Sequence, residues 1–114
     1  MEDCLFCKII NGDIPSKKIY EDDNTYAFYD ISPQAKVHAL VVPKQHVPSL
    51  AANSDMTDAQ IAACLRTCHK VAEQLGIAQS GYRVVCNAGD DACQTVHHLH
   101  FHVIGGNQLN GQMA

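Results

Sequence analysis

Basic residues are few in this sequence, and they form no cluster. The 114 residues include 8 Lys and Arg against 12 Asp and Glu, which gives a formal net charge of −4 with neutral histidines. Binding of nucleic acid over a large surface needs a basic stripe that neutralises phosphates, so this distribution disfavours that function. A small anionic ligand held by a few local donors remains compatible with it.

The start of the chain lacks a long hydrophobic run. Its first residues, MEDCLFCKIING, include two acidic residues and an early lysine, and are typical of neither a secretory signal nor a membrane span. The chain also lacks internal repeats, low-complexity tracts and linkers. Its length and its hydrophobic fraction of 46% suit one compact domain over residues 1–114. We therefore expect a single cytoplasmic domain without a membrane or nucleic-acid partner.

Paired spacing is absent from four of the six cysteines, which are Cys64, Cys68, Cys86 and Cys93. We interpret these four as buried, reduced thiols of a cytosolic protein rather than as a disulfide scaffold. Cys4 and Cys7 do form a Cys-x-x-Cys pair. On its own this pair is compatible with a redox pair, a disulfide or two unrelated thiols, although no thioredoxin-like strand precedes it.

Five short apolar runs bounded by turn residues predict strands. The runs lie at residues 18–21, 26–29, 37–42, 82–87 and 98–104. The first two are separated by Asp22, Asp23 and Asn24, which suits a hairpin. With the two helices described next, these runs predict an α+β domain with a five-stranded, mainly antiparallel sheet.

The hydrophobic period predicts one short helix and one long helix. Residues 5–10 have a helical pattern that ends at Asn11-Gly12. The long helix is expected to begin after Thr57, which forms a capping box with Gln60, and to close at Gly76. Its buried stripe is expected to comprise Ile61, Leu65, Cys68 and Ala72, with Val71 and Leu75 beside it.

Three histidines alternate with apolar residues in the last predicted strand. Because successive side chains on a strand point to opposite faces, His98, His100 and His102 should share one face. The outer two would lie about 13–14 Å apart at Cα, so the three rings cannot easily converge on one zinc ion. We favour separate tasks around one anionic substrate: a nucleophile, a proton donor and a cationic hydrogen-bond donor. His97 and His69 are expected to be structural or surface residues.

This segment resembles the signature of the histidine-triad (HIT) family, His-φ-His-φ-His-φ-φ with φ apolar. Here it reads His98-Leu99-His100-Phe101-His102-Val103-Ile104. Segments similar to the family's nucleotide-binding branch are FCKIINGDIPSKKIYEDD, AFYDISPQAKVHALVVPKQH, GYRVVCNAG and QTVHHLHFHVIGG. The resemblance implies the family's α+β fold and a homodimer whose sheet continues across the interface.

The resemblance also implies a purine nucleoside phosphoramidase. His100 would attack the α-phosphorus of a nucleoside 5′-phosphoramidate and form a nucleotidyl-histidine, which water resolves. His38 and the backbone would orient that ring, His102 would donate to a phosphate oxygen, and Thr95 would pass a proton to the leaving group. Two alternatives stay open: a dinucleoside polyphosphate hydrolase, and a nucleotide-binding or scaffolding module with incidental turnover.

By the same resemblance, the nucleotide would be held by residues outside the triad. Asp30 would accept from the ribose hydroxyls, while Asn87 and Gln94 would hold the phosphate. The apolar slot for a purine base would consist of Phe6, Ile9, Phe28 and Ile31. Neither of the common glycine motifs for phosphate binding is present.

Some members of the family bind zinc through a Cys-x-x-Cys pair and two histidines. The corresponding residues here are Cys4, Cys7, His46 and His98. The resemblance thus implies a closed, structural Cys₂His₂ zinc site that catalysis does not require.

The chain departs from the family pattern in two places. Ala92-Cys93 stand where the loop before the triad usually carries two glycines, and the tail NQLNGQMA lacks a tryptophan-proline ending. A Cβ in that loop is expected to tighten the phosphate pocket or to shift the loop.

Overall fold

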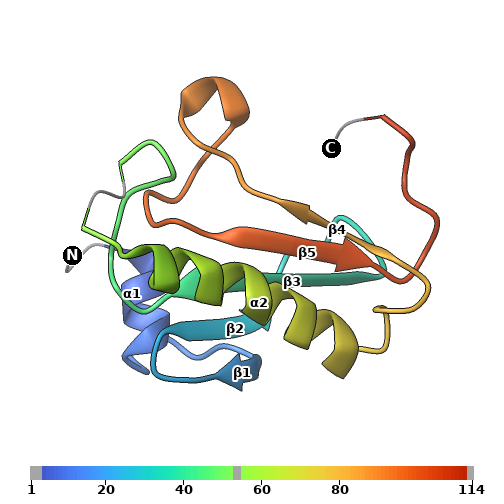
Figure 1. The fold of residues 1–114 in the computed structure, drawn as a ribbon, viewed down its shortest axis with the longest axis horizontal. Helices are drawn as coiled ribbons and strands as arrows, with labels where there is room; N and C mark the ends of the chain where they lie inside the picture. Colours follow the sequence, from blue (N-terminus) through green and yellow to red (C-terminus); the bar gives the residue numbers. More distant parts are fainter. Residues whose placement is uncertain (1–3, 53–54, 113–114) are drawn as a thin grey trace.

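The computed structural model describes residues 4–52 and 55–112, which form one antiparallel sheet with a helix against each face (Figure 1). Residues 1–3, 113 and 114, at the ends of the predicted domain, lie outside the described residues, as do residues 53 and 54. The elements in chain order are α1 (Leu5–Ile10), β1 (Lys18–Glu21), β2 (Thr25–Tyr29), β3 (Val37–Pro43), α2 (Asp58–Gln74), β4 (Tyr82–Val85), the short 3₁₀-helix η1 (Asp90–Ala92) and β5 (Phe101–Gly105). The strands are ordered β1-β2-β3-β5-β4, which confirms the α+β fold with five strands, one long helix and one short helix.

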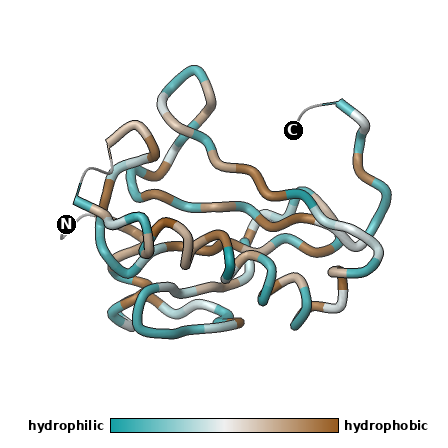
Figure 2. Tube along the Cα trace, in the orientation of Figure 1, coloured by the Kyte–Doolittle hydropathy of each residue, from teal (hydrophilic) through white to brown (hydrophobic). Residues whose placement is uncertain are grey.

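Side chains on the central strands point alternately to the two faces of the sheet and form one apolar cluster on each face. On β3, Ala39 and Val41 belong to the cluster under α2, whereas Leu40 and Val42 belong to the cluster under α1. Figure 2 shows hydrophobic stretches along the strands and much of the hydrophilic sequence in the connecting segments. Since α1 has only six residues, it covers part of its face and leaves the rest open for a site.

Helix α2 begins as predicted but buries a different arc of its surface. The Thr57 hydroxyl accepts from the Gln60 N–H, and the Gln60 side chain accepts from the Thr57 N–H, which completes the capping box. The prediction that Leu65 is buried was wrong, because 52% of it is exposed. The buried residues are Cys64, Thr67, Cys68, Val71 and Ala72. The buried arc is therefore rotated away from the predicted stripe, and Leu65 falls at its solvent edge.

β5 begins at Phe101 rather than at His98, so His102 lies in the strand, whereas His98 lies in a bend before it. The register pairs Val41 with Phe101, so Leu99 comes opposite Pro43, which has no N–H to donate. The Leu99 N–H donates to the Val47 carbonyl at 2.8 Å, and the Pro43 carbonyl accepts from His98 Nε2 at 2.8 Å, so neither group continues the ladder. The predicted strand over residues 82–87 is likewise shorter, since β4 ends at Val85.

The six cysteines are free thiols with different surroundings. Cys64 and Cys68 are buried, and burial raises the pKa of the Cys64 thiol to about 11 and that of Cys68 to about 12. Cys93 is exposed, so the prediction that it is buried was wrong. Its φ of 63° lies in the left-handed region that favours glycine, at one of the positions where the family usually carries glycine.

Within residues 4–52 and 55–112, no helix is both long and apolar enough to cross a membrane.

Candidate active site

A cleft of about 910 Å³ opens on the α1 side of the sheet. Residues of α1, β2, β3, β5 and the segment before β5 line it. The predicted site residues that it brings together are Phe6, Ile9, Phe28, Asp30, Ile31, His38, Thr95, His100 and His102. Ile31 is 98% exposed, so it stands at the rim of the cleft rather than in a core.

Other residues of the cleft wall were missed from the sequence. The apolar ones include Ile14, Leu40 and Val96, and two cations, Lys17 and Lys36, line the same cleft. Leu40 could have been found, because it lies two residues after His38 on a strand and therefore on the same face. For the lysines no local signal existed, since nothing in their spacing points to the cleft.

The His100 ring has a defined tautomer. Its Nδ1 lies 2.7 Å from the His98 carbonyl oxygen, which can only accept, so the Nδ1–H donates and Nε2 carries the lone pair. The residue is buried, and this burial lowers the pKa of the His100 imidazole. His100 is therefore a neutral ring with a basic Nε2 in the wall of the cleft.

A chain of three groups determines the tautomer of His102. The Gln34 backbone N–H donates to His38 Nδ1 at 2.9 Å, which leaves the proton of the neutral His38 ring on Nε2. His38 Nε2 lies 2.8 Å from His102 Nδ1, so it donates there and His102 keeps its own proton on Nε2. Burial, together with the rings of His100 and His38, lowers the pKa of His102 to about 4. His102 thus presents a neutral Nε2–H donor beside His100, with the two ring centroids 5.2 Å apart.

This pairing differs from the role that the resemblance implied for His38. The prediction had His38 orienting the nucleophile His100, whereas its ring-to-ring hydrogen bond goes to His102. His100 is oriented by the backbone of His98. The physical reason is the register: His38 stands on β3 opposite Ile104, and Leu40 stands opposite His102, so His38 is closer to His102 than to His100.

Asp30 has one carboxylate oxygen occupied by its own turn. Its Oδ1 accepts the Ser32 N–H at 2.8 Å, and its Oδ2 lies 3.4 Å from His38 Nε2. Burial lowers the pKa of His38 more than this carboxylate raises it, so the pair is a contact between a neutral imidazole and a carboxylate, while the Nε2–H of His38 is donated to His102.

Two predicted phosphate-binding residues do not line the cleft. The Gln94 side chain accepts from the Gly89 N–H at 2.9 Å and donates to the carbonyls of Pro48 at 2.7 Å and Val96 at 3.0 Å. Its amide therefore holds the loop that carries Thr95. Asn87 is half-buried just beyond the end of β4, outside the lining of the cleft.

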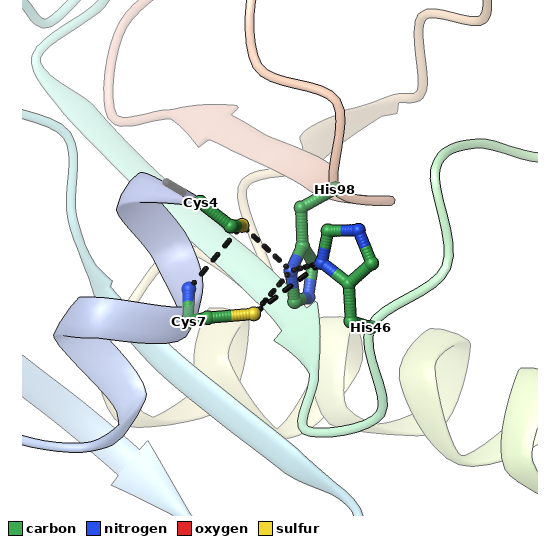
Figure 3. A group of neighbouring side chains, drawn as sticks. All are labelled: Cys4, Cys7, His46 and His98. Atoms are coloured by element: carbon green, nitrogen blue, oxygen red, sulfur yellow. Dashed lines mark hydrogen bonds between the residues drawn. The ribbon is translucent and has the colours of Figure 1, made fainter. Parts of the chain in front are cut away.

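Next to the cleft, Cys4, Cys7, His46 and His98 converge on one point (Figure 3). The Cys4 sulfur lies 3.3 Å from His98 Nδ1, and the Cys7 sulfur lies 3.3 Å from His46 Nδ1 and 3.5 Å from His98 Nδ1. The two Nδ1 atoms are 3.2 Å apart. A tetrahedral ion with Zn–S near 2.3 Å and Zn–N near 2.1 Å has S···N edges of about 3.6 Å and N···N edges of about 3.4 Å. The four donors therefore have the spacing that a tetrahedral metal ion requires.

The protonation of His98 also suits a ligand. His98 Nε2 lies 2.8 Å from the Pro43 carbonyl oxygen and must donate to it, so Nδ1 is left as a bare lone pair facing the sulfurs. Burial lowers the pKa of His98 to about 4. Burial and the neighbouring Cys4 raise the pKa of the Cys7 thiol to about 11. A bound cation would reverse that last effect, because metal binding deprotonates thiols.

Comparison with known proteins identifies the family to which this site belongs. The HIT domain family model matches residues 11–109. The purine nucleoside phosphoramidase of Escherichia coli (strain K12) is 39% identical over 113 residues, which are 99% of this chain and 95% of that protein. Among solved structures, a histidine triad protein from Clostridium difficile superposes with a TM-score of 0.90 at 43% identity, covering 99% of this chain and 98% of the other. A HIT family hydrolase from Clostridium thermocellum superposes with a TM-score of 0.91 at 39% identity, covering 100% and 99%.

Proposed function

The chain belongs to the HIT domain family, and we propose that within it the protein is a purine nucleoside phosphoramidase that acts through a nucleotidyl-histidine on His100. Hydrolase activity as such is supported by the HIT family hydrolase that it matches along its whole length. The observation that carries the proposal is the hydrogen bond from His100 Nδ1 to the His98 carbonyl. It leaves Nε2 of a buried, neutral imidazole as a nucleophile in the cleft.

The first step forms one bond and breaks one. Nε2 of His100 attacks the α-phosphorus, the P–N bond breaks, and the leaving amine takes up a proton from solvent water, relayed by the Thr95 hydroxyl. The His98 carbonyl, 2.7 Å from Nδ1, stabilises the positive charge that the ring acquires. The Nε2–H of His102 donates to a non-bridging phosphate oxygen as charge builds on it. Water then attacks phosphorus, releases the nucleoside monophosphate and restores the neutral ring.

The cleft supports a nucleotide as the bound half of the substrate. Phe6, Ile9 and Phe28 provide apolar surface for a base, and Asp30 retains acceptor capacity for ribose hydroxyls. Lys17 and Lys36 supply positive charge for an anion within an acidic protein. We assign Gln94 an indirect part, in which it holds the Thr95 loop in place.

We also propose that the cluster of Cys4, Cys7, His46 and His98 holds a structural zinc ion. The donor set and its spacing support this assignment. When bound, the ion supplies a tie between the N-terminal segment and the sheet, and no step of the reaction passes through it.

A homodimer is the third part of the proposal. β4 is an edge strand, whose outer backbone groups are free to pair with another strand. Beside it, the hydrogen bond between His69 and the Tyr82 hydroxyl, at 2.6 Å, joins α2 to β4. Leu65 and Val84 are exposed on these same two elements, which gives a second copy apolar surface to cover. Light scattering on the intact chain should give twice the mass of one chain.

The function is tested by hydrolysis of adenosine 5′-phosphoramidate with the wild type and with His100→Ala. We expect release of AMP that is lost in the variant, and an adenylyl adduct on His100 in acid-quenched wild type by mass spectrometry. His97→Ala is the matched control, because His97 is exposed and should leave turnover intact. A folded wild type that binds AMP without hydrolysing the phosphoramidate would contradict the proposal. Assays with dinucleoside polyphosphates would then distinguish the two alternatives, a dinucleoside polyphosphate hydrolase and a nucleotide-binding module.

A further inference from the structure

Helix α1 belongs to two sites at once. Cys7 lies on this helix and Cys4 caps its first turn, so both sulfurs of the cluster come from α1 and its cap. From the same helix, Leu5, Phe6 and Ile9 line the cleft. The geometry of the metal-donor cluster and the shape of the cleft therefore both depend on where α1 lies against the sheet.

One aromatic ring spans the two sites. The Phe6 ring stands edge-on to His98, a member of the cluster, with centroids 5.9 Å apart. It also stands edge-on to His100 at 5.1 Å and to Phe28 at 5.6 Å, both in the cleft wall. A movement of α1 that displaces Phe6 would change the cleft wall and the packing of His98 together.

Among the described residues, the packing of α1 on the sheet rests on the buried side chains of Phe6 and Ile9 and the partly buried Ile10. A helix of six residues is not stable by itself. Phe6 and Ile9 are its buried residues. The open cleft lies on one side of the helix, and a second cavity of about 480 Å³, lined by Cys7, Lys8, Ile10 and Asn11 among others, lies on another. An ion bridging Cys4 and Cys7 to His46 and His98 would be the strongest tie between α1 and the sheet.

We propose that a metal ion in the cluster and a purine nucleotide in the cleft bind cooperatively, with α1 as the shared element and Phe6 as the residue that couples the two sites. This inference rests on the proposed nucleotide and zinc sites. Because linkage is reciprocal, the factor by which zinc tightens nucleotide binding equals the factor by which nucleotide tightens zinc binding. Couplings of this kind usually amount to about 5- to 150-fold.

The first experiment compares AMP binding by zinc-loaded and zinc-free wild type with isothermal calorimetry. Zinc is removed from the reduced full-length protein with a chelator and then restored. We expect the AMP dissociation constant to rise at least about fivefold without zinc and to return when zinc is added back. Circular dichroism should show that the sheet persists, because the cluster under α2 does not involve α1.

The second experiment reads the same coupling from the metal side and needs only loaded protein. A chromogenic chelator competes for zinc with and without saturating AMP. Saturating AMP should lower the zinc dissociation constant obtained from this competition by the factor that calorimetry gives for AMP. This readout does not depend on turnover.

Variants separate the coupling from each site. Phe6→Leu keeps all four metal donors and should still bind zinc. Because Phe6 lines the cleft, its loss should weaken AMP binding in both metal states, and the test of coupling is that the ratio of the two AMP dissociation constants falls toward 1. Cys7→Ser removes a donor and should bind AMP as the zinc-free wild type does. Cys93→Ser is the control cysteine, since Cys93 is exposed and lies outside both sites.

The outcomes are distinguishable. Equal AMP dissociation constants in the two metal states, or zinc retention that AMP does not change, would overturn the coupling and leave the proposed function standing. Failure of the zinc-loaded protein to bind AMP would overturn the proposed function, and the coupling with it. Failure to bind zinc would overturn the metal site and the coupling but not the phosphoramidase.

Discussion

At the scale of single residues, the site depends on which nitrogen of each imidazole holds the proton. Backbone groups make that choice: the His98 carbonyl for His100, and the Gln34 N–H, acting through His38, for His102. Backbone groups cannot change protonation, so they impose a tautomer more firmly than another titrating side chain could. The His100 ring thereby has a nucleophilic Nε2, and the His102 ring has an Nε2–H that can donate a hydrogen bond.

The first prediction concerns His38 as a positioning residue. His38→Leu removes the donor to His102 Nδ1, so His102 can hold its proton on either nitrogen, and kcat should fall by about 10²-fold. His38→Gln keeps an amide donor of similar reach and should recover part of the loss. Steady-state kinetics and AMP affinity measured together test this: a change in AMP affinity alone, with kcat unaltered in both variants, would contradict it.

At the scale of elements, helix ends and strand registers position the site. α2 has its N-terminus closed by reciprocal hydrogen bonds of Thr57 and Gln60 at 3.1 and 2.8 Å. β3 ends at Pro43, which has no N–H, and its ladder with β5 extends only to the Val41–Phe101 pair. Just before β5, the His98 carbonyl accepts from Nδ1 of the His100 ring.

The second prediction concerns the cap of α2. Thr57→Ala leaves the Gln60 N–H without its partner and should lower the free energy of unfolding by about 1 kcal/mol. Thr57→Ser keeps the hydroxyl and should stay close to wild type. Urea unfolding checks this: the midpoint should shift in the alanine variant without a change in slope. Equal midpoints for the two variants would show that the cap contributes nothing.

At the scale of the whole molecule, three buried histidines and the half-buried His102 are gathered on one side of the sheet. For His38, His98, His100 and His102, burial lowers the pKa. Such groups are neutral in the folded protein but take up protons in the unfolded chain at mildly acidic pH. The stability of the molecule is thereby linked to pH through its active site.

The third prediction is acid sensitivity. The pKa of His102 drops from 6.5 to about 4 on folding, so the unfolded chain binds more protons between these values. The free energy of unfolding should therefore decrease as the pH falls from 6.5 toward 4. His102→Gln should reduce this slope by at most about 1.4 kcal/mol per pH unit. Unfolding curves across this range measure the slopes; equal slopes in the wild type and in His102→Gln would contradict the assignment.

The sequence by itself determined the helices and strands and the capping box at Thr57. It also determined the alternation that puts Leu99 on the core side of the histidine segment. These features are encoded by neighbours within a few residues, so periodicity and caps reveal them. Only the tertiary structure decided that His38 donates to His102 and that the Gln94 amide hydrogen-bonds to backbone groups of and beside its own loop. It also decided that Phe6 packs against one histidine of each site. Those choices depend on which strands pair, in which register, and on how a short helix docks. No local pattern contains that information, because the contacts join residues up to 94 positions apart.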